Sequence, residues 1–125
     1  MVKWLIGIFL TMIVAIGIAI GLPYKPKTTI TWDAPVTYTD GTPLPAGTIK
    51  GYKLYFSPTS GVYTDAQGRD VGNVLTANIE QTFGILDGTY YFVATAYTGT
   101  GVESPFSNEI SSVFARQSNS PKSLR

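Results

Sequence analysis

The eight carboxylates are this chain's main candidates for acid–base chemistry near neutral pH, because the sequence contains neither histidine nor cysteine. Ser-His-Asp and Cys-His catalysis therefore cannot be assembled from it, and neither can a zinc or iron site with imidazole or thiolate ligands. Two carboxylate pairs remain, Asp65 with Asp70 and Asp33 with Asp40. Glycoside hydrolysis needs two carboxyl groups that face each other across a sugar-sized cleft, which a small single domain does not provide by itself. We expect solvated loop acids and no enzymatic activity.

One segment superficially resembles a metal-binding loop: residues 65–70, which read Asp-Ala-Gln-Gly-Arg-Asp. This segment lacks the alternating ligands and the final glutamate of a calcium-binding EF-hand loop, so a turn is the better interpretation. Residues 68–70 are also in the wrong order for the Arg-Gly-Asp motif that integrins recognise. The sequence therefore predicts no metal and no cofactor.

The charged residues are unevenly placed, although the formal net charge is only +1. Residues 28–115 carry three basic and eight acidic residues, whereas Lys25 and Lys27 precede this segment and three basic residues follow it. An acidic body with short basic flanks lacks the basic surface that nucleic acids require, so no nucleic-acid partner is predicted. Residues 116–125 have the composition of a flexible basic tail.

An uncharged hydrophobic run, WLIGIFLTMIVAIGIAIGL, occupies residues 4–22. As a helix with a rise of ~1.5 Å per residue it extends roughly 28 Å, close to the hydrocarbon thickness of a bilayer. The run is longer than the roughly 7–15 apolar residues of a typical signal peptide, which favours a retained transmembrane anchor over residues 1–22. Ala19 and Gly21 also satisfy the small-residue rule for cleavage before Leu22, so a removable leader stays open as the alternative.

The residues in and around the hydrophobic run complete the domain organisation. Gly17 and Gly21 have the small-xxx-small spacing of a helix-packing face, although glycine is also simply common in membrane helices. The prolines within residues 23–27 stop any continuing helix and predict a short, stiff linker. The short N-terminal end has nothing to translocate, so we expect the folded domain, residues 28–115, on the extracytoplasmic side of a membrane.

Beyond residue 27 the apolar residues alternate with a period of two, which predicts β-strands. Tyr52, Leu54 and Phe56 share one face of a strand, and Tyr90 and Phe92 share one face of another. Turn-forming pairs such as Asp-Gly separate these runs at fairly regular intervals, and no stretch has helical periodicity. This pattern is typical of an antiparallel β-sandwich or barrel.

Six short blocks within residues 28–114 resemble, in order and in spacing, the successive blocks of bacterial fibronectin type III domains. The blocks are residues 30–35 (ITWDAP), 40–44 (DGTPL), 51–55 (GYKLY), 60–64 (SGVYT), 87–92 (DGTYYF) and 103–109 (ESPFSNE). Any one block has low specificity, whereas six in sequence are specific. The resemblance implies an all-β, immunoglobulin-like (fibronectin type III) antiparallel sandwich behind an N-terminal transmembrane helix.

The resemblance also implies structural roles for the large aromatic residues. Trp32 corresponds to the core tryptophan of the second strand, and Tyr90 to the tyrosine corner, with Tyr91 as the alternative if the register differs by one. With the two strand faces described above, the predicted core consists of Trp32, Tyr52, Leu54, Phe56, Tyr90 and Phe92. The family begins with a first strand well before the tryptophan, where this chain has residues 22–27. We therefore expect that strand to be short, distorted or missing, and one sheet edge to be less covered.

Three tyrosines, Tyr55, Tyr91 and Tyr97, fall on the outward face of neighbouring strands in this register. Exposed tyrosines are frequent at protein and sugar interfaces, and ordinary cross-strand stabilisation is the alternative. We expect a non-enzymatic, membrane-anchored structural or interaction protein of a cell-surface assembly or of a membrane-containing bacterial virus. Its partners would be the lipid bilayer, coat or envelope proteins, or copies of itself. The alternative is a secreted module with a cleaved leader that binds a polysaccharide or a protein.

Overall fold

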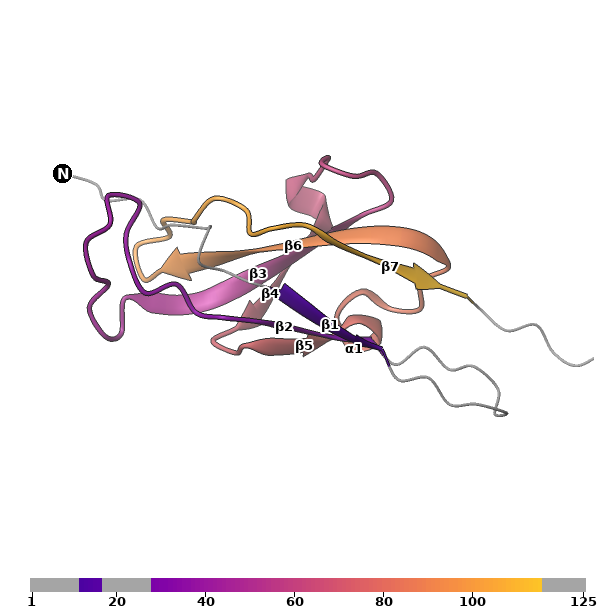
Figure 1. Ribbon diagram of the computed structural model, residues 1–125, viewed down its shortest axis with the longest axis horizontal. Helices are drawn as coiled ribbons and strands as arrows, with labels where there is room; N and C mark the ends of the chain where they lie inside the picture. The colour runs from indigo at the N-terminus through magenta and orange to yellow at the C-terminus, as the bar shows by residue number, and fades with distance from the viewer. Residues whose placement is uncertain (1–11, 17–27, 116–125) are drawn as a thin grey trace, which may run out of the picture.

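The computed structural model describes residues 12–16 and 28–115, which form two antiparallel β-sheets packed face to face (Figure 1). Four of the sequence predictions lie outside the described residues: those for the linker 23–27, the tail 116–125, Gly17 and Gly21. Everything below concerns the described residues.

The larger sheet has four strands in the order β4-β3-β6-β7. Its members are β3 (Ile49–Ser57), β4 (Gly68–Gly72), β6 (Gly88–Thr98) and β7 (Ile110–Phe114). The two longest strands, β3 and β6, pair along most of their length, from Ile49 opposite Thr98 to Ser57 opposite Tyr91. Their β-branched and aromatic residues suit a pleated surface that is buried on one side, which is why the period of two predicts these strands.

The smaller sheet has three strands in the order β1-β2-β5. They are β1 (Met12–Ile16), β2 (Thr28–Trp32) and β5 (Thr76–Asn78), and β2 pairs antiparallel with both neighbours. A first strand is therefore present and short, and it comes from residues 12–16, whereas residues 22–27 lie outside the described residues. It covers the sheet edge that the sequence predicts to be less covered.

Strand β1 corrects the prediction of one continuous helix over residues 4–22, because Met12–Ile16 lie in the middle of that run. Three of its five residues, Ile13, Val14 and Ile16, are β-branched, and a short apolar run suits a buried strand as well as a membrane helix. The edge of β2 supplies backbone hydrogen-bonding partners, which lipid does not. Within the part of the chain that is described, no helix combines the length and hydrophobicity needed to cross a bilayer.

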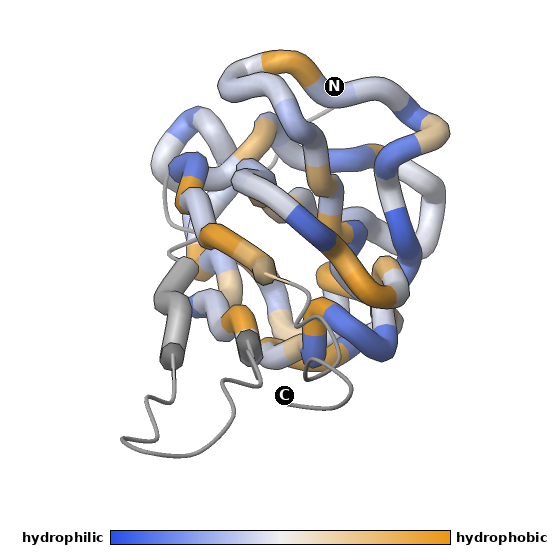
Figure 2. Tube along the Cα trace, turned by 90° about the vertical axis from the view of Figure 1, so that its right-hand side faces the viewer, coloured by the Kyte–Doolittle hydropathy of each residue, from blue (hydrophilic) through white to orange (hydrophobic). Residues whose placement is uncertain are grey.

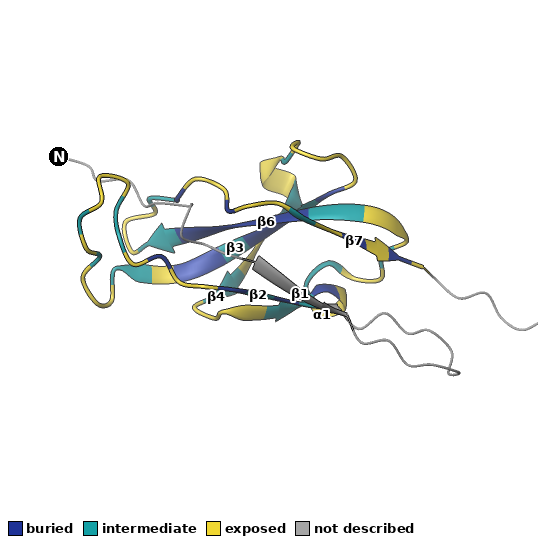
Figure 3. Cartoon of the chain, in the orientation of Figure 1, coloured by how far each residue is buried: buried dark blue, intermediate teal, exposed yellow. Residues whose placement is uncertain are grey.

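The core lies between the inner faces of the two sheets, where alternate residues of β2, β3 and β6 meet (Figure 3). The structure buries four of the six predicted core residues and packs the other two, half-buried, against them: Trp32, Tyr52, Leu54 and Phe92, then Phe56 and Tyr90. The rings of Trp32 and Tyr52 join the two sheets, with their centroids 5.7 Å apart.

Tyr90 lies on the inner side of β6. Its ring centroid is 5.9 Å from that of Phe56 and 6.2 Å from that of Phe114. Tyr91 occupies the other face of the strand, opposite Ser111 of β7. The structure therefore has the register in which Tyr90, and not Tyr91, faces the core.

Two short helices interrupt the strands, although the sequence shows no helical periodicity beyond residue 27. They are a 3-10 turn, η2 (Asp65–Gln67), and a five-residue helix, α1 (Ile79–Phe83). Asn78 caps α1 by accepting a hydrogen bond from the amide of Gln81, and Gly84, at φ 86°, ends it. A helix of little more than one turn is too short to produce a periodic pattern.

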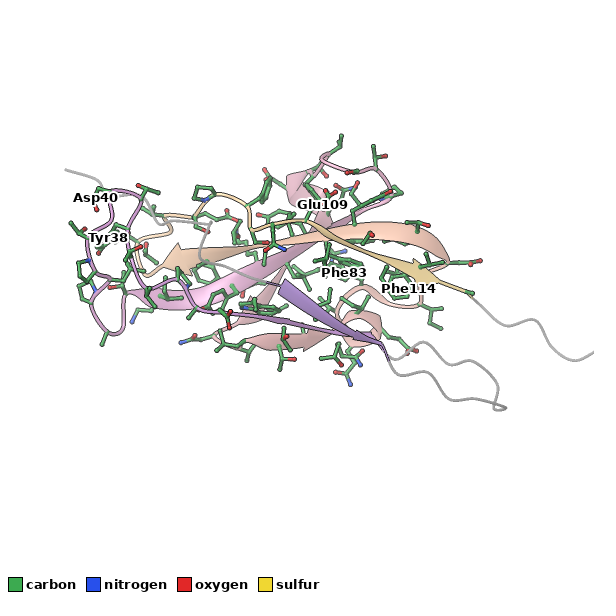
Figure 4. All side chains as sticks on the ribbon, in the orientation of Figure 1. Tyr38, Asp40, Phe83, Glu109 and Phe114 are labelled. Atoms are coloured by element: carbon green, nitrogen blue, oxygen red, sulfur yellow. The ribbon has the colours of Figure 1, made fainter. Side chains whose placement is uncertain are left out.

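The two ends of the sandwich differ in their contacts (Figure 4). At one end Phe83 of α1 packs on Phe56 with ring centroids 4.2 Å apart, and Phe114 lies at the same end. At the opposite end Asp40 accepts hydrogen bonds from the amide and the hydroxyl of Thr42, at 2.9 and 2.6 Å. These two bonds belong to the turn that the Asp-Gly pair at residues 40–41 predicts.

Candidate functional site

The outer face of the four-stranded sheet carries a carboxylate, Glu103, that three side chains surround. The hydroxyls of Tyr55 and Thr95 both donate to Glu103 Oε1, and Lys53 Nζ lies 3.6 Å from Oε2. Lys53 and Thr95 are directly opposite each other on β3 and β6. Burial raises the pKa of Glu103, but the two hydrogen bonds and the Lys53 charge outweigh it and hold that pKa below its ordinary value. These four residues, the Glu103 cluster, keep a charged carboxylate fixed on the sheet.

Glu103 reaches the sheet because residues 103–109 run alongside β6. The amides of Ser104 and Ser107 donate to the carbonyls of Ala96 and Ala94, at 2.8 and 2.9 Å. The two serine hydroxyls in turn accept hydrogen bonds from the amides of Ala96 and Ala94, both at 2.9 Å. Serine side chains thus replace the carbonyls that a regular strand would offer, which lets the segment rise over the outer face of the sheet.

A second carboxylate, Glu109, ties the loop between β3 and η2 to the same segment. It accepts hydrogen bonds from the hydroxyls of Ser60 and Tyr63 and from the amide of Gly61. The bonds from Ser60 and Tyr63 hold the pKa of Glu109 below its ordinary value. Burial, and then the bond to Glu109, raises the pKa of the Tyr63 hydroxyl. We call residues 103–109 and this loop, residues 58–64, the outer cover.

Tyr55 is buried and does not belong to an exposed face, since only 5% of its surface is accessible. The ring of Phe106 meets it edge-on at 5.2 Å and also lies 5.5 Å from Tyr63. Burial, and then the hydrogen bond to Glu103, raises the pKa of the Tyr55 hydroxyl. The prediction of a solvent-facing Tyr55 is therefore wrong. Alternation places the side chain outside the sandwich, but the outer cover lies over that part of the sheet.

The other two tyrosines of the predicted interaction face, Tyr91 and Tyr97, are half-buried. The Tyr97 hydroxyl donates to the two carboxylate oxygens of Asp70, at 3.0 and 2.9 Å, and this hydrogen bond raises the pKa of Tyr97. Tyr91 lies between Ser57 of β3 and Ser111 of β7. These two tyrosines keep accessible surface, but they occupy separate positions along β6 and do not form one aromatic patch with Tyr55.

A groove with a cavity volume of about 650 Å³ lies between β4 and β5, which are edge strands of the two different sheets. This volume falls within the range of small-ligand sites. Most of its lining is neutral polar or small and apolar, beside one cation and one carboxylate: Thr29, Val71, Val74, Thr76, Ala77, Asn78, Gln81 and Thr82, with Arg69 and Asp70. Because Asp70 also binds the Tyr97 hydroxyl, Tyr97 lies next to the wall of the groove.

Arg69 is held in place at the wall of this β4–β5 groove. Its guanidinium carbon lies 6.0 and 5.9 Å from the ring centroids of Phe56 and Phe83. Its Nη1 donates to the carbonyls of Ala66 and Gly68, at 2.9 and 3.0 Å. The groove therefore offers a fixed cation and several amide and hydroxyl groups, whereas the Asp70 carboxylate is already bound by Tyr97 and by the amide of Gly72. Such a set can recognise polar groups of a peptide or a glycan.

The carboxylate pair Asp65 and Asp70, singled out in the sequence, lies in a turn and at the start of a strand. Asp70 accepts from Tyr97 and, at 2.8 Å, from the amide of Gly72. Residues 65–70 form the η2 turn and the start of β4. The segment is therefore a turn, as the sequence indicates. Across residues 12–16 and 28–115 there is no group of three or more acidic side chains placed to hold a metal ion.

Hydrophobic residues are spread over several segments of the domain (Figure 2), and some of their side chains are exposed. The large exposed ones are Val36, Val62, Val74, Leu75, Ile85, Phe106 and Val113. Val74, which is 42% exposed, lines the β4–β5 groove. Exposed apolar surface and converging polar groups therefore meet at this groove.

Reasoning from the sequence missed the outer cover and the groove. The available signal was block 103–109, in which two glutamates flank two serines three residues apart. Nothing in that spacing says that the segment returns over the sheet to reach Tyr55. The groove depends on the relative placement of β4 and β5, which no local pattern records.

Comparisons with known proteins add a structural similarity to this geometry. No family model matches the chain, and no curated protein matches it. Among solved structures, the chain is similar to the solution structure of the sixth fibronectin type III domain of human fibronectin type III domain containing protein 3. The two are 21% identical with a TM-score of 0.46, and the match covers 78% of this chain and 79% of that one. The chain's own two antiparallel sheets, stacked through a shared core, are consistent with an immunoglobulin-like sandwich.

Proposed function

We propose that this chain is a non-enzymatic interaction protein, in which residues 28–115 form the binding domain and residues 4–22 anchor it in a membrane. The observation that carries the binding role is the β4–β5 groove, an open groove of about 650 Å³ that amide, hydroxyl and apolar side chains line beside Arg69. Fixed polar groups beside apolar surface are the usual composition of a recognition site. The uncharged run at residues 4–22 supports the anchor, which requires Met12–Ile16 to leave the sheet.

Membership of the bacterial fibronectin type III family is part of the same proposal. It is supported by the six sequence blocks, which fall on the strands and turns of the two sheets in their expected order. It is further supported by the inward position of Trp32 and Tyr90.

The proposed absence of catalysis follows from the chemistry of the side chains. The chain has no imidazole and no thiol. Three of its carboxylates bind tyrosine hydroxyls in structural contacts: Asp70 binds Tyr97, Glu103 binds Tyr55 and Glu109 binds Tyr63. A carboxylate engaged in this way positions the chain and is not directed at a substrate.

The proposed setting is the extracytoplasmic side of a membrane, in a cell-surface assembly or in a membrane-containing bacterial virus particle. Coat or envelope proteins, or copies of the chain, would be the partners there. A domain joined to the hydrophobic run by residues 23–27 would be held close to the membrane surface. That distance favours partners in the same membrane or in a layer next to it.

The anchor is tested by flotation of the full chain with phospholipid vesicles on a density gradient, followed by mass spectrometry of its N-terminus. We expect the intact chain to float. Ile8→Lys, which places a charge in the run outside β1, should prevent flotation, whereas Val113→Lys on exposed β7 should not. Recovery of a chain that lacks its first 21 residues and stays dissolved without detergent would refute the anchor.

A second candidate is a secreted module that binds polysaccharide after its leader is removed. It is favoured by the amides of Asn78 and Gln81 in the groove and by Tyr97 next to it, since amides and tyrosines commonly hold sugars. A glycan array separates the candidates. Binding that is lost in Gln81→Ala and kept in the control Val113→Ala would support the secreted module, and an array without signal would exclude it.

A further inference from the structure

Strand β1 and the proposed anchor use the same residues. Met12–Ile16 lie at the centre of residues 4–22, so any helix that crosses a bilayer through this run must include them. In a helix the backbone N–H and C=O groups bond within the segment, and they cannot pair with a neighbouring strand at the same time. This inference rests on the proposed membrane anchor. Whenever the run lies in lipid, the edge of β2 is without β1.

The edge of β2 that β1 covers has a defined set of backbone groups. The amide of Trp32 donates to the carbonyl of Leu75 at 3.0 Å, on the β5 side. In an antiparallel sheet the backbone groups of successive residues point to opposite sides of the strand. Thr29 and Thr31 therefore turn their N–H and C=O groups toward β1. The backbone pairing of these two residues with β1 is lost when β1 leaves the edge.

The residues of β1 indicate what kind of strand this edge accepts. The antiparallel register places Met12 opposite Trp32, Val14 opposite Ile30 and Ile16 opposite Thr28. Ile30 and Trp32 are 0% and 3% exposed in the domain with β1 in place. β1 also adjoins β7, the far edge strand of the other sheet, so it closes one side of the sandwich. The edge thus takes an uncharged extended segment with apolar residues at alternate positions.

We propose that the β2 edge is a strand-binding site for a partner protein. When residues 4–22 lie in the bilayer, an extended, uncharged segment of a second protein takes the place of Met12–Ile16 and pairs antiparallel with Thr28–Trp32. Addition of a strand to an open sheet edge is a common way of binding peptides, in which main-chain hydrogen bonds supply affinity and alternate side chains supply specificity. The chain's own hydrophobic segment then acts either as the anchor or as an internal occupant of the site.

The occupant in the anchored state comes from a different protein and not from a second copy. Every anchored copy has its own residues 12–16 in lipid, so none has this strand to donate. Strand β2 is itself a poor substitute, because three of its five residues are threonine. A partner strand like β1, with apolar residues at three alternate positions and no charge, fits the edge better.

The test uses the full chain with Ala15→Pro, because Ala15 faces Thr29 and proline removes the amide at that position. Ala19→Pro is the matched control, since it changes the same hydrophobic run outside β1. The probe is a peptide with the sequence of residues 11–18, flanked by lysines for solubility, and a second peptide carries proline at the Ala15 position. Amide hydrogen exchange at Thr29 and Thr31 is followed by NMR.

We expect Ala15→Pro to speed exchange at Thr29 and Thr31 at least tenfold, and Ala19→Pro to leave it unchanged. The peptide should restore protection in Ala15→Pro, and the proline-containing peptide should not. If Ala15→Pro does not fold alone, regained chemical-shift dispersion on addition of the peptide supports the site equally. A peptide that neither restores protection nor restores folding overturns the proposal. Protection that returns with protein concentration alone also overturns it, because the occupant is then a second copy.

A second arm uses the wild-type chain bound to phosphatidylcholine–phosphatidylglycerol vesicles. We expect rapid exchange at Thr29 and Thr31 in the vesicle-bound chain, and at least tenfold slower exchange once the peptide is added. If the chain floats but both amides stay protected without peptide, β1 remains on the domain and the strand-binding proposal fails while the anchor stands. If the chain does not float, the anchor fails, and with it the anchored-state site proposed here.

Discussion

Each face of the four-stranded sheet has buried residues at its centre, but the two faces are covered by different means. On the inner face Leu54 and Phe92 are fully buried against the smaller sheet. On the outer face Tyr55 and Thr95 are 5% and 1% exposed, beside a charged carboxylate, Glu103, that both of them bind. The inner face is covered by apolar packing, and the outer face by hydrogen bonds and one partly exposed aromatic ring.

This difference separates what holds the fold together from what shapes its surface. The stabilisation from apolar packing between sheets scales with the buried area, and a truncated side chain adds the cost of the cavity that it leaves. The outer cover depends on a few polar contacts, each with a modest net effect on stability because water competes for the same groups. We therefore expect substitutions on the inner face to affect global unfolding, and substitutions under the outer cover to have smaller effects.

The largest expected effect is that of Phe92→Ala on the inner face. Phe92 is 0% exposed and its ring lies 6.0 Å from those of both Phe83 and Phe114, so truncation leaves a cavity at the centre of the domain. The free energy of unfolding should fall by about 3–5 kcal/mol. Urea denaturation followed by far-UV circular dichroism measures this loss.

Phe106→Ala is the matched control for that substitution, on the other face. Phe106 is 48% exposed, so the same truncation removes less buried surface, and the free energy of unfolding should fall by about 1 kcal/mol. Equal losses for the two phenylalanines would contradict the comparison and would make the outer cover part of the core.

The inner face could be predicted from the sequence because its signal is local. Alternation over residues 52–56 and 90–96 places the core side chains without knowledge of the rest of the fold. The same alternation places Tyr55 outside the sandwich correctly, but it cannot show that residues 103–109 return over it. The exposed fraction of Tyr55 depends on the position of residues 103–109, which the sequence of the strand itself does not determine.

The β4–β5 groove and strand β1 could not be predicted for related reasons. The groove requires the edges of two sheets to lie near each other, and Asp70 and Gln81 come from separate elements. Residues 12–16 are apolar enough for lipid and β-branched enough for a sheet, so composition alone does not choose between the two. The edge of β2, about fifteen residues further on, supplies the missing information.

Two glycines lie beside tyrosines of the outer face, and their substitution compares how firmly each tyrosine is held. A Cβ at Gly68 would lie 2.7 Å from Tyr55 Cε1, and Tyr55 cannot yield because Phe106 and Glu103 hold it. Gly68 has an ordinary φ of −86°, so Gly68→Ala tests this overlap and not backbone strain. We expect a loss of about 2 kcal/mol in the free energy of unfolding.

Gly51→Ala is the matched case on the less covered part of the face. Its Cβ would meet the hydroxyl end of Tyr97, a half-buried side chain whose hydrogen bond to Asp70 is exposed. We expect a smaller loss than for Gly68→Ala, with release of Asp70 as its main consequence. Thermal unfolding of both variants measures the two losses of stability. A larger loss for Gly51→Ala would show that Tyr97 is held as firmly as Tyr55.

Removal of the Tyr55 and Tyr97 hydroxyls compares a partly buried hydrogen bond with an exposed one. Tyr55→Phe leaves Glu103 with Thr95 and Lys53 as partners, and the free energy of unfolding should fall by about 1 kcal/mol. Tyr97→Phe should leave stability unchanged, because water replaces the hydroxyl on Asp70. Parallel urea titrations measure both, and a clear loss for Tyr97→Phe would contradict the distinction between covered and open positions.

The smallest change in stability that we expect to measure is a dependence on acid. Burial raises the pKa of Glu103, but the hydrogen bonds from Thr95 and Tyr55 and the Lys53 charge lower it further, so its net folded-state pKa lies below the ordinary glutamate value of about 4.3. The unfolded chain therefore takes up the proton first as the pH falls. The Glu103 contribution is fully present above that value and is lost as the pH drops through the folded pKa.

Because Glu103 and Lys53 are partly exposed, at 32% and 40% of their side chains, this contribution should amount to roughly 0.5 kcal/mol. Urea denaturation at a series of pH values between about 2.5 and 6 measures it. Glu103→Gln should flatten that part of the profile, whereas Lys53→Gln should shift it to higher pH and keep it. Since Glu109 also has a lowered pKa, some acid dependence should persist in both variants. An unchanged profile in Glu103→Gln would mean that the carboxylate covers Tyr55 sterically, without its charge contributing to stability.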